Sequence, residues 1–135
     1  PLQRLDALVE SPLVLLIAVE GGPYDEPSIT WDELLTPSGL ADVARYADGI
    51  GPYLGHVLAA DGSPTALIGD AHAAGLAVHP WTLRKENAFL PPALKKGSDA
   101  AAQGDLAALV GMVVAAGANG VFTDDPALVV SALGR

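Results

Sequence analysis

The spacing of apolar residues changes from helical to continuous within the first part of the chain. Apolar positions recur at helical intervals from Leu2 to Val9, which predicts a helix. After the break at Ser11-Pro12, the uninterrupted apolar run from Leu13 to Val19 is typical of a strand covered on both faces, as in a parallel sheet flanked by helices. Thr36-Pro37 then predicts a second helix, with threonine as N-cap and proline as the first helical residue.

The alternation of strand and helix continues to the end of the chain. In order, the pattern predicts a short strand at Asp48-Gly49-Ile50, a helix from Ser63-Pro64 to near Gly75, a strand from Leu76 to Thr82, an irregular stretch from Arg84 to about Gln103, a long helix to Gly117, a strand from Asn119 to Asp124, and a helix from Asp125-Pro126 to Gly134. Four strands are therefore expected to alternate with five helices.

This alternation indicates an α/β fold with right-handed crossovers and a parallel sheet. A (β/α) barrel and a doubly wound sheet both fit it. The chain contains one internal repeat, in which a helix is followed by a glycine, a strand and a polar tip. The part from the glycine to the polar tip lies at residues 75–84 and again at 117–125, and the repeat suits a barrel as well as an open sheet. No low-complexity segment or hinge divides residues 1–135, so one domain is expected.

Composition narrows the classes of function. The net charge of −9 would repel a phosphate backbone, which argues against a nucleic-acid partner. The absence of cysteine rules out a disulfide framework and thiolate metal ligands. The longest apolar run, from Leu13 to Val19, is far shorter than the roughly 20 residues that span a bilayer, so no membrane span is expected.

Four segments together carry a resemblance to a known family. They are Leu15-Leu16-Ile17, Tyr46-Ala47-Asp48-Gly49-Ile50-Gly51-Pro52, Gly75 to Arg84 (Gly-Leu-Ala-Val-His-Pro-Trp-Thr-Leu-Arg) and Gly120-Val121-Phe122-Thr123-Asp124. In order and spacing the chain resembles barrel strands five to eight of the periplasmic and secreted glycerophosphodiester phosphodiesterases. The resemblance implies the C-terminal half of a TIM (β/α)8 barrel over residues 1–135. It also implies metal-dependent hydrolysis of glycerophosphodiesters to glycerol 3-phosphate and an alcohol, in a periplasmic or secreted protein.

The chain departs from the family at the residues that carry the chemistry. The family's His-Arg-Gly segment, its Glu-x-Asp pair and its second histidine near the N-terminus do not occur here, and the only histidines are His56, His72 and His79. The resemblance therefore places the Ca²⁺ or Mg²⁺ ligands, and the acid and base, on an N-terminal half absent from this chain. No catalytic residue and no metal ligand is expected in these residues, and the chain alone is expected to be inactive.

Three substrate contacts are predicted where apolar runs become polar, because barrel sites form at the carboxyl ends of strands. Alternation places His79 and Trp81 on one face of their strand. The Trp81 ring is expected to cover the glycerol or alcohol portion of the substrate, although a core aromatic of the barrel is an equal alternative. Arg84 is the favoured phosphate contact, because a guanidinium fork binds phosphate oxygens bidentately. His79 is the third predicted substrate contact. A histidine within an apolar strand is more often a hydrogen-bonded core residue than a general base, so no catalytic role is predicted for it.

The remaining polar residues have weaker claims. Lys85, Lys95 and Lys96 accompany Arg84 in or beside one long loop, either as further phosphate contacts or as a solvated basic loop. Phe89, Leu90 and the following two prolines are expected either to form a partial lid or to pack over the rim. Glu20 directly follows a buried strand and is a weak candidate for a place near the metal. Asp48 and Asp124 are expected to organise turns, and Asp125 is expected to cap the last helix. No role is assigned to His56 or His72.

A half-barrel leaves two unpaired strand edges and an open inner face, so a partner is expected. That partner is either the N-terminal half of the same enzyme as a separate chain, or a second copy. The opening of the sequence at Pro1, in what is expected to be the helix after strand four, is interpreted as a cut. Two rivals remain: a non-catalytic half-barrel serving as a structural or ligand-binding module, and a small doubly wound phosphate binder, which no Gly-rich fingerprint supports.

Overall fold

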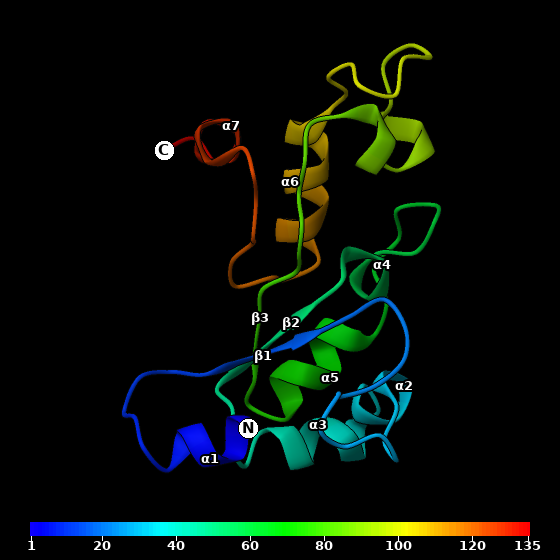
Figure 1. Cartoon of the computed structure of the whole chain (residues 1–135). Helices are drawn as coiled ribbons and strands as arrows, with labels where there is room; N and C mark the ends of the chain where they lie inside the picture. Colours follow the sequence, from blue (N-terminus) through cyan, green and yellow to red (C-terminus); the bar gives the residue numbers. More distant parts are fainter.

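Three parallel strands form the sheet of the computed structural model, which describes all of residues 1–135. They are β1 (Val14–Ile17), β2 (Gly49–Pro52) and β3 (Ala77–Val78), in the order β1-β2-β3. Leu15 is paired with Ile50, and Gly49 with Ala77. The predicted α/β fold with a parallel sheet is confirmed, and Figure 1 shows β1 and β2 side by side at the centre of the molecule.

The fourth predicted strand, at residues 119–124, is wrong as a regular strand. The segment lies parallel to the chain after β3 and pairs with it at one bridge, Leu83 to Thr123. Single backbone hydrogen bonds join Asn119 N–H to the Val78 carbonyl and Phe122 N–H to the Pro80 carbonyl. Pro80 has no N–H to donate, which interrupts a regular ladder here and ends β3 well before Thr82.

Helices flank the strands in chain order. They are α1 (Leu2–Asp6), α2 (Trp31–Leu34), α3 (Pro37–Val43), α4 (Leu54–Val57), α5 (Leu67–Ala73), α6 (Leu106–Ala115) and α7 (Pro126–Ala132), with short 3₁₀ turns η1 (Asn87–Phe89) and η2 (Pro92–Leu94). The predicted N-cap of α3 is confirmed, because the Thr36 hydroxyl accepts the Gly39 N–H at 3.2 Å. The count of five helices is wrong, since the single turns α2 and α4 were not expected. None of the helices combines the length and apolar content needed to cross a bilayer.

The predicted start of α5 at Ser63-Pro64 is also wrong. The Asp61 side chain accepts the Ser63 N–H at 2.9 Å, and Leu58 bridges Pro64 in an antiparallel pair. This local turn uses the backbone groups that a helix would need, so α5 begins only at Leu67.

One face of the sheet is covered and the other is open. Ile17, Ile50 and Val78 are fully buried in a core shared with α3 and α5, which lie below the sheet in Figure 1. On the opposite face Leu16 is 58% exposed and Phe122 43% exposed. The expectation that the Leu13 to Val19 run is covered on both faces is therefore wrong for residues 1–135, in which Leu16 is exposed.

Candidate functional site

A cavity of about 740 Å³ opens at the carboxyl end of the sheet. It lies between the segment that follows β2 and the loop that follows β3, which are joined by the parallel bridge from Tyr53 to Trp81. Its mostly apolar lining comes from residues 53–55, 58–60, 81–82, 84 and 88–92. This is the edge of the sheet where barrel enzymes build their sites.

Trp81, one of the lining residues, is held in a fixed orientation. Its indole Nε1 donates to the Gly51 carbonyl oxygen at 2.8 Å. Its ring meets the ring of Tyr53 edge to face, with 5.6 Å between centroids. Both contacts restrict the side-chain rotamer, so the indole presents a preformed apolar surface to the cavity.

Arg84 also lines the cavity, but carboxylates already neutralise it. Its Nε lies 3.1 Å from Asp124 Oδ2 and 3.6 Å from Glu86 Oε2. Arg84 Nε and Glu86 Oε2 are both buried, and neither atom has a hydrogen-bond partner. The two contacts are therefore ion pairs without the geometry of a hydrogen bond. The guanidinium carbon stacks 4.0 Å above the Phe89 ring. Asp124, expected only to organise a turn, thus helps to place this arginine.

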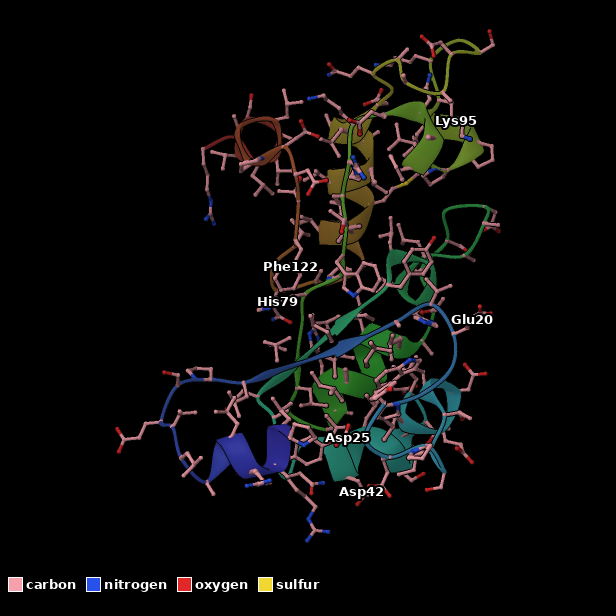
Figure 2. All side chains as sticks on the ribbon, in the orientation of Figure 1. Glu20, Asp25, Asp42, His79, Lys95 and Phe122 are labelled. Carbon is pink, nitrogen blue, oxygen red and sulfur yellow. The ribbon has the colours of Figure 1, made fainter.

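His79 does not share the cavity with Trp81 and Arg84. Its ring packs edge to face against Phe122, with 6.4 Å between centroids, and the two labels lie together in Figure 2. Gly120 makes room for it, because a Cβ there would lie 2.9 Å from His79 Cδ2. The structure therefore brings together two of the three predicted contacts and leaves His79 beside the open inner face of the sheet.

The three lysines near Arg84 do not converge on the cavity. Lys85 Nζ lies 2.6 Å from Asp125 Oδ1, and Lys96 Nζ lies 3.2 Å from Asp105 Oδ2. Lys95 is exposed without an ion pair and lies beside η2 in Figure 2. None of the three lines the cavity, so Arg84 is the only cation that faces it.

The pair of Lys85 and Asp125 replaces the cap that Asp125 was expected to form. Asp125 occupies the N-cap position of α7 without a side-chain capping bond, because its carboxylate accepts the Lys85 ammonium and the Lys85 N–H instead. The hydrogen bond from Lys85 lowers the pKa of Asp125, and the bond to Asp125 raises the pKa of Lys85. The pair fastens the start of the loop after β3 to the start of α7.

This pair predicts a bounded pH range for its contribution to stability. The depressed pKa of Asp125 means that its contribution is present above the ordinary value of 3.8 and is lost as the pH falls through the folded pKa. The raised pKa of Lys85 means that its contribution is present below 10.5 and is lost as the pH rises through the folded pKa. The destabilisation by Asp125→Asn in urea unfolding should therefore be constant between these limits and shrink beyond both. Asp42→Asn, at a carboxylate 76% exposed, is the control and should have little effect on the free energy of unfolding.

The other acidic and histidine side chains do not assemble a metal site. Glu20 is exposed in the loop after β1, and Asp48 precedes β2 at the opposite edge, where it accepts the Leu13 N–H. His56 Nε2 bonds the Ala18 carbonyl and His72 Nε2 bonds Asn119 Oδ1. No three His, Asp or Glu side chains gather to hold a cation. The donor set of this chain does not fit the hard divalent ion that the family resemblance implies.

Two residues of the site had not been singled out. Tyr53 could have been noticed as the aromatic residue directly after the apolar Gly49–Pro52 strand. Asn87 gave no sequence signal, because it lies in a polar loop, yet it is only 2% exposed. Its Nδ2 donates to the Lys96 and Asp99 carbonyls and its Oδ1 accepts the Lys96 N–H, so it holds the cavity's loop wall together.

Comparisons with known proteins bear on the family and the fold of the chain. The model of the glycerophosphoryl diester phosphodiesterase family matches residues 2–128. Glycerophosphodiester phosphodiesterase GDPD6 of Arabidopsis thaliana is 31% identical over 87 residues, which are 62% of this chain and 23% of that protein. A crystal structure from Agrobacterium tumefaciens, named as a glycerophosphoryl diester phosphodiesterase, superposes with a TM-score of 0.55 at 17% identity, over 96% of this chain and 38% of the other.

These likenesses settle the family and the fold class. The chain spans about a quarter of the length of the curated relative and 38% of the solved chain. The superposition confirms the predicted fold class, an α/β structure whose parallel sheet is consistent with part of a TIM barrel. Because the family model covers nearly all of these residues, the chain belongs to the glycerophosphoryl diester phosphodiesterase family.

Proposed function

We propose that this chain forms the substrate-contact side of a metal-dependent phosphodiesterase that hydrolyses glycerophosphodiesters to glycerol 3-phosphate and an alcohol. The observation that carries the proposal is the cavity at the carboxyl edge of the sheet, where Trp81 and Arg84 meet in a chain of this family. The family supports the enzyme class, and the two side chains supply binding rather than bond cleavage.

In this proposal the chain binds and orients the substrate. The fixed Trp81 indole gives an apolar wall against which the carbon skeleton of the substrate packs. Arg84 donates to a phosphate oxygen while Asp124 and Glu86 hold its guanidinium in place. The same carboxylates compete with the phosphate, so we assign Arg84 a moderate contribution to affinity. His79 stays a candidate contact only through the open inner face of the sheet.

The acid, the base and the metal ligands belong, in this proposal, to another part of the complete enzyme. Ca²⁺ or Mg²⁺ would there polarise the phosphoryl oxygens. We assign those groups to the N-terminal half of the barrel, and we expect no activity from residues 1–135 alone. The periplasmic or secreted location is likewise proposed from the family branch.

An alternative is a non-catalytic half-barrel that serves as a structural or ligand-binding module. The observation in its favour is that no three acidic or histidine side chains converge in this chain. A second copy could then cover the inner face in place of an N-terminal half. The two functions differ in whether any assembly that contains this chain releases glycerol phosphate.

Arg84→Ala tests the proposed contact in the completed enzyme. With glycerophosphocholine as substrate, KM should rise by about tenfold to a hundredfold with a smaller change in kcat, because a hydrogen bond to a charged group is lost. Lys95→Ala, at an exposed lysine outside the cavity, is the matched control and should leave KM unchanged. A wild-type KM in Arg84→Ala would remove the phosphate role.

A further inference from the structure

Three ring side chains form a row along the carboxyl edge of the sheet. The rings of His56 and Tyr53 meet edge to face with 6.2 Å between centroids, and the rings of Tyr53 and Trp81 do so with 5.6 Å. Tyr53 and His56 come after β2, and Trp81 comes after β3. Aromatic pairs in this geometry attract each other beyond the area that they bury. The row therefore joins α4 to the segment that carries Trp81.

Both ends of the row are fastened to backbone carbonyls. At one end Trp81 Nε1 donates to the Gly51 carbonyl oxygen at 2.8 Å. At the other end His56 Nε2 lies 2.9 Å from the carbonyl oxygen of Ala18, in the loop after β1. A carbonyl oxygen only accepts, so His56 Nε2 carries the hydrogen in this contact. The row thereby connects the segments that follow β1, β2 and β3.

The local backbone fixes the place of Tyr53 at the centre of the row. Tyr53 N–H donates to the Ile17 carbonyl at 3.0 Å, and Leu54 N–H donates to the Trp81 carbonyl at 2.9 Å. The ring itself lies against Gly55 of α4, where an added Cβ would come within 2.7 Å of Tyr53 Cε1. The ring can keep its present position only while residue 55 has no side chain.

We propose that Tyr53 is a positioning residue, which holds the Trp81 indole in the orientation that it presents to the substrate and is itself supported by His56. The inference rests on the proposed function, because it takes Trp81 as a substrate contact. The hydrogen bond at Nε1 fixes one atom of the indole, and the contact with the Tyr53 ring fixes its plane. His56 is not among the residues that line the cavity, so it acts through Tyr53 and not on the substrate.

Fluorescence of Trp81 in the chain alone gives the first test. Trp31→Phe leaves Trp81 as the sole indole, and the buried Trp31 Nε1 has no hydrogen-bond partner to lose. In this background Tyr53→Leu should raise the acrylamide quenching constant of Trp81 by about twofold, because the indole loses its edge-to-face partner. Tyr53→Phe keeps the ring and should restore the parent value. An unchanged constant in Tyr53→Leu would overturn the proposal.

Two further variants test what holds the Tyr53 ring. Gly55→Ala displaces the ring without removing it and does not weaken α4, because alanine is the better helix former. It should raise the quenching constant while circular dichroism shows the chain still folded, and a parent value would contradict the assigned position of the ring. Gly69→Ala, in α5 where an added Cβ meets nothing, is the matched control and should leave the constant unchanged. His56→Ala should raise it by a smaller factor than Tyr53→Leu, and a parent value there would remove His56 from the proposal.

Kinetics of the completed enzyme keep this inference apart from the proposed function. Tyr53→Leu should raise KM for glycerophosphocholine by about twofold to tenfold with a smaller change in kcat, and Tyr53→Phe should restore the parent KM. Raised quenching in Tyr53→Leu without release of glycerol phosphate by any assembly would reject hydrolysis and keep the positioning of Trp81. Release of glycerol phosphate with a parent KM in Tyr53→Leu would keep hydrolysis and reject the positioning role.

Discussion

Asn87→Ala is expected to lower the free energy of unfolding by about 3 kcal/mol, because it removes three hydrogen bonds of a buried amide. Two carbonyls and one N–H of the loop lose their partner. Urea unfolding measures the loss. Hydrogen exchange should show the amides of residues 96–102 opening first, and the same variant should weaken ligand binding because residues 88–92 form one wall of the cavity.

Two variants make this prediction specific. Asn87→Asp keeps the oxygen that accepts the Lys96 N–H but turns a second oxygen toward the carbonyls of Lys96 and Asp99. It should destabilise the chain at least as much at neutral pH and less once the carboxyl group is protonated. Gln103→Ala removes an exposed amide from the same loop and should have little effect. A loss below about 1 kcal/mol in Asn87→Ala would show that water replaces the amide.

The helices and strands that the sequence predicted correctly are those whose formation depends on residues within or directly beside the element. The continuous apolar run gave β1, and Thr36-Pro37 gave the start of α3 through its own cap. The single turn α2 depends on a reciprocal cap between Thr30 and Glu33. A helix of four residues is too short to leave a periodic pattern of apolar positions. The start of α5 was misplaced because the side-chain turn at Asp61 competed with the helix.

The site residues that lie at strand ends could be predicted from the sequence, whereas those brought together by tertiary contacts could not. The rule that barrel sites lie at carboxyl ends of strands selects Trp81 and Arg84, and both line the cavity. The same rule cannot show that Asp124 would meet Arg84, because these two residues lie in different loops and converge only when both loops fold together. Asn87 is buried by a loop with little regular structure, and no sequence period reports such burial.

The chain alone is expected to release no glycerol phosphate from glycerophosphocholine, and addition of a polypeptide that carries the His-Arg-Gly and Glu-x-Asp segments should raise the rate by at least about a thousandfold. General acid and base catalysis contributes about a hundredfold to ten-thousandfold, and the metal adds to it. The reconstituted activity should require added Ca²⁺ or Mg²⁺. The measurement is glycerol phosphate release from each chain alone and from the mixture.

A substitution on the open face of the sheet tests whether the added polypeptide covers that face in the assembly. Leu16 is 58% exposed, so Leu16→Asp should change the stability of the chain alone by less than about 1 kcal/mol. In the assembly the same carboxylate would be buried without a partner, so activity and complex formation should both be lost. Leu128→Asp, at a 38% exposed leucine of α7, is the control and should retain both. If the chain instead forms a dimer that Leu16→Asp disrupts, and the added polypeptide yields no activity, the inner face is covered by a second copy and the non-catalytic alternative holds.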